Sequence, residues 1–278
     1  MNLMAVIDEI QRRLDFKHWA GYPQFSNDVG LGRIAVIAFM LGSIFSLHVA
    51  ALCLLYLDRS GCINLGVVEG ISSSRTVLIF QWLAYIIVLC VFHLAEFFVT
   101  AIWNPSVLTA TCFVVNHSKS YTVAMLVSGF EFLIRFLIFP TRNSNLISAI
   151  GLALILIGQL VRSLAMITCA ESFNHVIQHT KKQSHKLVTH GVYRYLRHPS
   201  YFGFFYWSVG TQLMLGNILT GITFAIASWL FFNRRIPFEE QTLTRLFPKE
   251  YPAYMKESYI GIPAIQSIAK LYEKDHSS

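Results

Sequence analysis

Long apolar segments separated by short polar ones run along most of this chain. Four of them carry few or no charged residues: 33–57, 77–103, 121–139 and 146–169. Because about 20 residues of helix cross the hydrocarbon core of a bilayer, each segment predicts one membrane-spanning helix. Asn104-Pro105 is expected to end the second of these helices, since proline has no backbone N–H and disfavours helix in the residue before it.

Shorter apolar segments predict elements of a different kind. Residues 107–115 are too few to span a bilayer and predict a re-entrant or lateral element. Residues 201–215 and 218–232 are joined by Gly216-Asn217, a turn signal, and together predict a tight helical hairpin that enters or barely crosses the membrane.

Polar segments lie between and beyond these elements. Residues 1–30 place apolar side chains at three- and four-residue steps, which favours a helix lying on the membrane surface over a span. Residues 171–199 form the first large loop outside the membrane. Residues 233–259 are polar and amphipathic, with apolar side chains at helix-like steps, and the last residues, 273–278, are expected to fray.

Composition supports a membrane protein over a soluble one. Of the 278 residues 54% are apolar and 13% charged, and the mean hydropathy is +0.51. The net charge of +7 comes largely from basic residues between apolar segments, as in cytosolic membrane loops, and no nucleic-acid-binding motif accompanies it. The five cysteines are scattered, without a C-x-x-C pair, and are expected to be small buried hydrophobes.

A few polar residues and glycines stand inside the predicted spans. Glu96 follows His93 by three positions on one helical face, which should look into protein or a wet cavity because a carboxylate is costly in lipid. Glu131 and Arg135 are spaced to pair. Gly151 and Gly158 are seven apart on one side of their helix, which predicts close contact with another helix. Arg162 is a further charged residue inside a predicted span, 146–169.

The stretch 185–203 is the densest mixture of polar, basic and aromatic residues in the chain. His198-Pro199 should end one element and open a helix from Ser200 onward. The first turn of that helix would offer free backbone N–H groups to an anionic group.

The sequence lacks the residues that several common catalytic and metal sites require. His175 and His179 have the spacing of a helical zinc pair, but Val176 stands where a zinc protease has its glutamate, and no cysteine or carboxylate cluster supplies a third ligand. The chain also has no serine in a nucleophile-elbow context and no glycine-rich dinucleotide fingerprint. A binding site made from loops remains, and we expect no bound metal and no nucleic acid.

Four sequence motifs resemble those of the isoprenylcysteine carboxyl methyltransferases: H-K-L-V-T at 185–189, G-V-Y at 191–193, R-H-P-S-Y-F-G at 197–203 and Glu239-Glu240. The likeness covers at least residues 170–262. The R-H-P-x-Y-x-G and E-E signals also occur in membrane phospholipid methyltransferases and, more loosely, in sterol reductases. The amino-acid sequences of segments 173–178 and 198–201 favour the prenylcysteine enzymes.

The resemblance implies an all-α polytopic membrane bundle of about six to eight spans, with a cytosolic cofactor site formed by C-terminal loops and short helices. Residues 1–170 would form the bundle that lines the lipid-substrate site, and residues 171–278 the catalytic region. It also implies S-adenosylmethionine as cofactor, contacted by Gln178, His185, Lys186, Leu187, Val188, Tyr193, His198, Pro199, Ser200, Tyr201 and Glu239.

The implied reaction is methylation of the C-terminal carboxylate of prenylated CaaX-type proteins, such as small GTPases, at the endoplasmic reticulum membrane with the site facing the cytosol. Arg162 would then face the substrate carboxylate, with Arg235 as a second candidate. Because an unpaired guanidinium at the centre of a span costs at least ~2.5 kcal/mol, the alternative is that Arg162 neutralises Glu96 or Glu131.

Three rival functions stay open from the sequence. A phospholipid methyltransferase would share the cofactor site but methylate an amine, and a sterol-reductase-like enzyme would bind NADPH. A purely structural membrane protein would explain the spans, but not the polar residues clustered at 178–201 and at Glu239.

Overall fold

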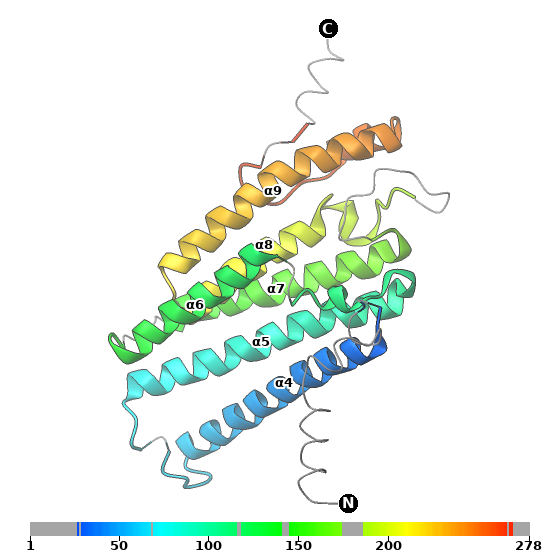
Figure 1. Ribbon diagram of the computed structural model, residues 1–278. Coiled ribbons are helices and arrows are strands. Elements are labelled where there is room, and N and C mark those ends of the chain that lie inside the picture. The colour runs from blue at the N-terminus through cyan, green and yellow to red at the C-terminus, as the bar shows by residue number, and fades with distance from the viewer. Residues whose placement is uncertain are drawn as a thin grey trace, which may run out of the picture.

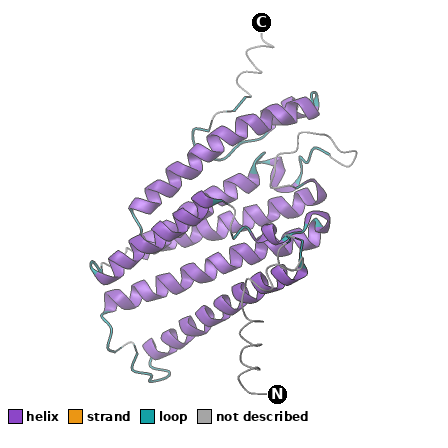
Figure 2. Cartoon of the chain, viewed as in Figure 1, coloured by secondary structure: helices purple, strands orange, loops and turns teal. Residues whose placement is uncertain are grey.

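The computed structural model describes residues 27, 29–67, 69–115, 118–140, 145–173, 186–265 and 267–268. These residues form helices joined by turns, and no β-strand occurs among them (Figure 2). A single isolated bridge joins Leu196 to Tyr259. The prediction of an all-α fold is therefore confirmed.

Four helices of the described chain are long and apolar enough to cross a membrane: α4 (Leu31–Arg59), α5 (Ser73–Trp103), α6 (Lys119–Leu137) and α7 (Asn145–Cys169). They coincide with the four predicted spans to within a few residues. Ser72 and Ser118 fix the starts of α5 and α6, because each side-chain oxygen accepts a backbone N–H three residues on. The protein is thus an integral membrane protein, as its composition predicts.

The 107–115 segment forms no helix long enough to span a membrane, as predicted. Two short 3₁₀ helices follow the end of α5: η1 (Pro105–Val107) leads into the segment and η2 (Ala110–Phe113) lies within it. Phe113 is buried and stacks on Phe97 of α5 with ring centroids 4.0 Å apart. Residues of α4 pack against the same cluster.

The remaining described elements are η3 (Ala170–Ser172), η4 (Gly191–Arg194), α8 (Pro199–Leu215), α9 (Leu219–Leu246) and α10 (Glu250–Glu257). Figure 1 shows α4, α5, α7, α8 and α9 succeeding one another across the molecule, with α6 crossing in front of α8. Aromatic and aliphatic side chains of α5, α7 and α8 fill the core between them.

Glycines bring α7 and α8 into backbone contact. A Cβ atom added at Gly158 would lie 2.5 Å from the carbonyl oxygen of Gly203, and one added at Gly151 would lie 2.8 Å from that of Gly210. Real Cβ atoms essentially never approach other atoms so closely, so only glycine fits at these crossings. The close helix contact predicted from the Gly151 and Gly158 spacing is confirmed.

The α8–α9 hairpin turns where the sequence predicts, but its second helix is longer than predicted. Gly216 adopts a φ of 73° after α8, which favours glycine. The hairpin was expected to end at residue 232, whereas α9 continues to Leu246 and contains Pro237. The change from apolar to polar residues near 233 therefore reflects different surroundings along one continuous helix and does not mark the end of that helix.

Glu131 and Arg135 fasten α6 to this hairpin. The Glu131 carboxylate accepts the backbone N–H groups of residues 218–220 at 2.7–3.0 Å, which stabilises the start of α9. Arg135 donates to the carbonyl oxygen of Leu215 at the end of α8. These contacts join α6 to α8 and α9. The sequence predicted only that the two side chains could pair with each other.

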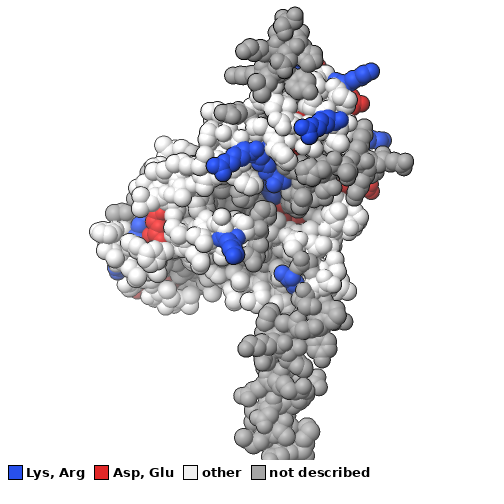
Figure 3. Space-filling view, turned by 45° about the horizontal axis from the view of Figure 1, so that its top comes forward, with Lys and Arg blue, Asp and Glu red and all other residues white. Residues whose placement is uncertain are grey.

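Many large apolar side chains are exposed on the described outer surface. No residue of α4 is buried, and large apolar side chains are exposed along α4, α5, α6, α7 and α9. In Figure 3 charged side chains gather toward the end that carries the C-terminal segment, and most of the remaining described surface is uncharged. An apolar surface of this extent is what a bilayer would cover. The total of six to eight spans stays a prediction.

Candidate active site

One large cavity, of about 480 Å³, runs along a single face of α9. Its α9 lining begins at Phe224 and ends at Leu246, with lining residues recurring at steps of one, three and four. At 1.5 Å per residue the cavity follows the helix over about 33 Å. Such length allows one ligand, or two ligands end to end, to meet very different surroundings.

The two halves of this cavity differ in chemistry. Toward the start of α9 its walls are apolar and include Phe224, Phe231 and, from α6, Met125. Toward the end of α9 they are polar and aromatic and include His198 and Glu239. The described site therefore joins a lipid-like environment to a polar one without a break.

Most site residues predicted from the sequence meet in this cavity. Its lining includes Lys186, Leu187, Val188, Tyr193, His198, Pro199, Ser200, Tyr201, Glu239, Arg162 and Arg235. Gln178 and His185 lie outside the described residues, as do His175 and His179. Among the residues that are described, no group of three or more His, Cys, Asp or Glu is placed to hold a metal ion.

The start of α8 presents His198 and Tyr201 side by side. His198 is the N-cap and Pro199 the first helical residue, so the predicted helix entry is confirmed. The backbone N–H groups of Tyr201 and Phe202 both donate to the carbonyl oxygen of His198. Because Pro199 has no N–H and the Tyr201 N–H already has a partner, this turn offers an anion fewer free N–H groups than predicted. The His198 and Tyr201 rings stack with centroids 5.6 Å apart.

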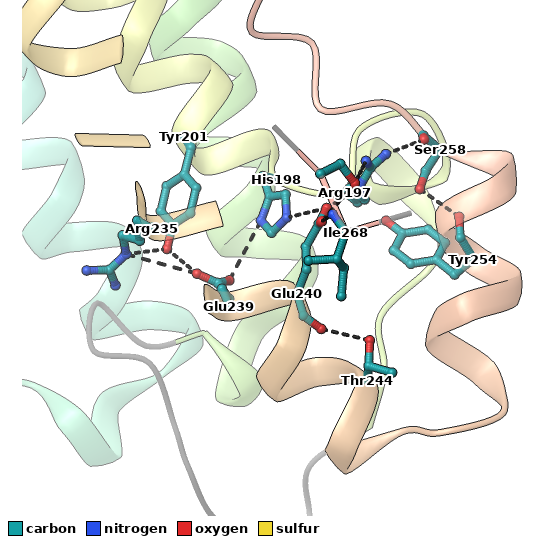
Figure 4. A network of polar contacts seen from close by, with 11 residues as sticks. Arg197, His198, Tyr201, Arg235, Glu239, Glu240, Thr244, Tyr254, Ser258 and Ile268 are labelled. Carbon is teal, nitrogen blue, oxygen red and sulfur yellow. Dashed lines mark hydrogen bonds and ion pairs between the residues drawn. The ribbon is translucent and has the colours of Figure 1, made fainter. Parts of the chain in front are cut away.

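Glu239 faces the cavity and lies within a small polar network (Figure 4). The Tyr201 hydroxyl donates to its Oε2 atom, and Arg235 Nε donates to that hydroxyl at 2.7 Å. His198 Nδ1 lies 3.7 Å from the other carboxylate oxygen. Because the Glu239 side chain is 23% exposed, its carboxylate keeps access to a ligand.

Glu240, the next residue, faces away from the cavity into a fully buried ion pair. Arg197 Nε donates to its Oε1 at 2.7 Å, and Ser267 and the backbone N–H of Ile268 donate to its Oε2. Although burial raises the pKa of Glu240, contacts from His198 and Arg197 lower it to about 2. The pair joins α9 to the loop before α8 and to the C-terminal segment (Figure 4).

Arg162 lines the cavity, but most of its donors already have partners. Its Nε and Nη2 atoms donate to the two carboxylate oxygens of Glu96 at 2.6 and 2.7 Å, a bidentate pair. Its Nη1 atom donates to the carbonyl and hydroxyl oxygens of Ser200. Four of its five N–H groups are thus used within the protein. Of the two structural partners expected for Arg162, the structure provides Glu96.

Arg235 lines the cavity from α9. Its Nε atom donates to Tyr201 and lies 4.0 Å from Glu239, one helical turn away. The guanidinium also lies over the rings of Tyr201 and Phe231. Arg235 therefore stands where the polar half of the cavity meets the apolar half.

Several lining residues were not predicted from the sequence. They include Tyr121 and Met125 of α6, Trp207 of α8 and Tyr251 of α10. The stripe of lining residues along α9 carries a helical period that could have been found, had that helix been extended past residue 232. The contributions of α6 and α10 depend on contacts between distant segments, which periodicity does not report.

The fold and the cavity define a polytopic helical membrane protein with an internal cavity that is polar at one end and apolar at the other. Residues 150–245 match the model of the isoprenylcysteine carboxyl methyltransferase (ICMT) family. The protein-S-isoprenylcysteine O-methyltransferase of Dictyostelium discoideum is 42% identical over 181 residues, which cover 65% of this chain and 76% of that protein. The chain belongs to the isoprenylcysteine carboxyl methyltransferase family.

Two further comparisons agree with this assignment. The protein-S-isoprenylcysteine O-methyltransferase of Xenopus laevis is 44% identical over 190 residues, which cover 68% of this chain and 65%, slightly less than two thirds, of that protein. A solved eukaryotic intramembrane Ras methyltransferase, isoprenylcysteine carboxyl methyltransferase, superposes with a TM-score of 0.67 at 31% identity, covering 95% of this chain and 94% of that one. The family resemblance seen in the sequence is thereby confirmed.

Proposed function

We propose that this protein transfers a methyl group from S-adenosylmethionine to the C-terminal carboxylate of a prenylated cysteine, forming a methyl ester. The observation that carries the proposal is the cavity of about 480 Å³ along α9, which joins apolar walls at Phe224 and Phe231 to a polar end at His198 and Glu239. A prenylated cysteine has a lipid tail and an anionic head, so it needs both halves. Membership of the family supports the same reaction.

The residues of the polar end suit S-adenosylmethionine. The Glu239 carboxylate can accept hydrogen bonds from the amino group of the methionine part. Tyr193 and His198 offer ring faces and hydrogen-bonding atoms, and Leu187 and Val188 offer apolar contact for a flat ring. Lys186 supplies a positive charge for the carboxylate of the same ligand.

The acceptor requires no general base. An α-carboxyl group has a pKa of about 3.5 and is ionised at neutral pH. S-adenosylmethionine supplies an electrophilic methyl group when it is bound. The task of the chain is therefore to hold the carboxylate in line and to exclude water, and correct positioning alone can supply a large part of the acceleration.

Arg235 is the residue that we expect to hold the substrate carboxylate. It lies one turn of α9 from Glu239, so substrate and cofactor would be bound at adjacent points of one rigid helix. Arg162 has at most one N–H group left for the substrate after its bonds to Glu96 and Ser200. Its main role would be to fix the wall of the site.

Methylation is tested with purified protein in lipid nanodiscs, given radiolabelled S-adenosylmethionine and one of three acceptors. A farnesylated cysteine should become labelled in a base-labile form, as a methyl ester requires, whereas cysteine without the lipid should not. Label on phosphatidylethanolamine would show an amine methyltransferase. Binding of NADPH without binding of S-adenosylmethionine would show a reductase-like enzyme, and no binding of either would leave a structural role.

We also place the protein in the endoplasmic reticulum membrane with the polar end of the cavity facing the cytosol, where prenylated CaaX-type proteins such as small GTPases are found. The basic content of the loops at that end supports this orientation. In cysteine-free protein, a cysteine replacing Lys249 should react with an impermeant thiol reagent added from the cytosolic side. Glu69 belongs to the connection between α4 and α5, which lies at the opposite ends of the helices from the end of α9 (Figure 1). A cysteine replacing Glu69 should therefore react only from the lumen. The reverse pattern would contradict the orientation.

A further inference from the structure

A buried hydroxyl group without a hydrogen-bond partner among the described residues lines the cavity near the end of α9. Tyr251, on α10, is 1% exposed and lines the cavity. Its hydroxyl oxygen has no hydrogen-bond partner within the described chain. Burying a hydroxyl without a hydrogen bond is costly, so a group placed in this way is best explained by a ligand that supplies the missing contact.

Other tyrosine hydroxyl groups at this end of the cavity have partners in the protein. The Tyr254 hydroxyl donates to the backbone carbonyl of Tyr193 at 2.5 Å, and the Tyr201 hydroxyl donates to Glu239. Tyr251 differs from them although it is at least as deeply buried. Its hydroxyl is therefore available to a ligand, whereas theirs serve the fold and the Glu239 network.

The surroundings of Tyr251 are apolar. Leu187, Leu243, Leu246 and Phe247 belong to the same packed cluster, and all four also line the cavity. A pocket with apolar walls and a single hydrogen-bonding group is suited to a flat heteroaromatic ring, which needs contact on its faces and one directed polar contact at its edge.

The position of this pocket relative to Glu239 fits one part of the proposed cofactor. Leu246 lies seven residues beyond Glu239 on α9, about 10 Å along the helix axis. This step rests on the proposed function, in which Glu239 receives the amino-acid part of S-adenosylmethionine. The nucleoside would then extend away from the acceptor, toward Tyr251.

We propose that the Tyr251 hydroxyl forms a hydrogen bond with the edge of the purine ring of S-adenosylmethionine, in the apolar pocket formed with Leu187, Leu246 and Phe247. Burial raises the pKa of this hydroxyl well above its usual value, so it stays protonated at neutral pH. It can therefore donate to a ring nitrogen or accept from the 6-amino group.

Calorimetric binding of S-adenosylhomocysteine, the demethylated product, to the full-length protein tests the proposal without depending on turnover. Tyr251→Phe removes only the hydroxyl, and we expect a three- to tenfold loss of affinity, as one neutral hydrogen bond provides. Tyr195→Phe is the matched control, because Tyr195 is exposed and does not line the cavity. Affinity should not change in that variant.

The unliganded proteins supply a second measurement. Since the Tyr251 hydroxyl has no partner in the described chain, its removal should leave the unfolding temperature unchanged or raise it. A tyrosine that merely supported the fold would lower that temperature when its hydroxyl is lost. An unfolding temperature several degrees below that of the parent, with the affinity loss explained by unfolding, would overturn the proposal.

Ligand analogues identify the atom that Tyr251 contacts. Four analogues of S-adenosylhomocysteine each lack one polar group of the purine: the 6-deamino, 1-deaza, 3-deaza and 7-deaza forms. One of them should bind the parent three- to tenfold more weakly and should bind Tyr251→Phe as tightly as it binds the parent, because both sides of the hydrogen bond are then absent. If Tyr251→Phe lost the same affinity for every analogue as for S-adenosylhomocysteine itself, the proposal would be overturned. If the parent bound no S-adenosylhomocysteine, the proposed function itself would fail.

Discussion

Glu239 and Glu240 are consecutive residues of α9, yet their carboxylates lie in different environments: that of Glu239 accepts from Tyr201 in the cavity, and that of Glu240 accepts from Arg197 in a buried pair. Successive residues of a helix point about 100° apart, since one turn takes 3.6 residues. The same helical segment therefore faces the cavity on one side and holds the C-terminal segment on the other.

Glu239→Gln should weaken binding of S-adenosylmethionine at least tenfold, because one charge-assisted hydrogen bond contributes ~1.5–3 kcal/mol. Glu240→Gln should change that affinity little but should lower the free energy of unfolding by about 3 kcal/mol, since it leaves the buried Arg197 charge without its partner. Calorimetric affinity and thermal unfolding of both purified variants separate the two effects. Equal affinity losses would show that the wrong carboxylate has been assigned to the cofactor.

The buried pair also predicts a pH dependence of stability. The pKa of Glu240 is lowered from 4.5 to about 2 in the folded protein, so its contribution is fully present above pH 4.5 and is lost as the pH falls toward 2. The parent should thus lose up to about 3 kcal/mol of unfolding free energy relative to Glu240→Gln across this window. Comparing the two proteins cancels other carboxylates, such as Glu131. A difference that stays constant from pH 7 to pH 3 would contradict the prediction.

The four long spans and the α8 entry at Pro199 could be predicted from the sequence, because apolar length and proline placement are local signals. The length of α9 could not, because polarity reports surroundings and not backbone continuity. At the site, the motifs identified His198 and Glu239, and the intramembrane position of Arg162 indicated a buried anionic partner. The choice of Glu96, and the finding that no described residue pairs with the Tyr251 hydroxyl, depend on which helices pack together.

Arg162 and Arg235 should respond differently to replacement by lysine. Arg162→Lys keeps the charge but loses the bidentate contact with Glu96, so we expect a lower unfolding temperature and less than a tenfold loss of turnover per folded molecule. Arg235→Lys should leave stability nearly unchanged and reduce single-turnover methylation more than tenfold, since the planar fork that orients the carboxylate is lost. The reverse pattern would place Arg162 at the substrate carboxylate and Arg235 in a structural role.

The contact between α7 and α8 leads to a last prediction, on how the cavity wall is held. Gly158→Ala would place a Cβ atom 2.5 Å from the carbonyl oxygen of Gly203 and 2.7 Å from the backbone nitrogen of Trp207. Because these are backbone atoms, the helices must separate, and we expect a loss of about 1–3 kcal/mol in unfolding free energy.

Gly42→Ala in α4 is the matched control for this change, since an added Cβ there meets nothing within 4 Å. It should leave stability unchanged or raise it by about 0.5–1 kcal/mol, because alanine favours helix over glycine. Separation of α7 from α8 would also displace Arg162 from Ser200, so Gly158→Ala should weaken S-adenosylhomocysteine binding and Gly42→Ala should not. Thermal unfolding and calorimetry on the two variants measure both effects. Two variants of equal stability would mean that α7 and α8 do not pack through their glycines.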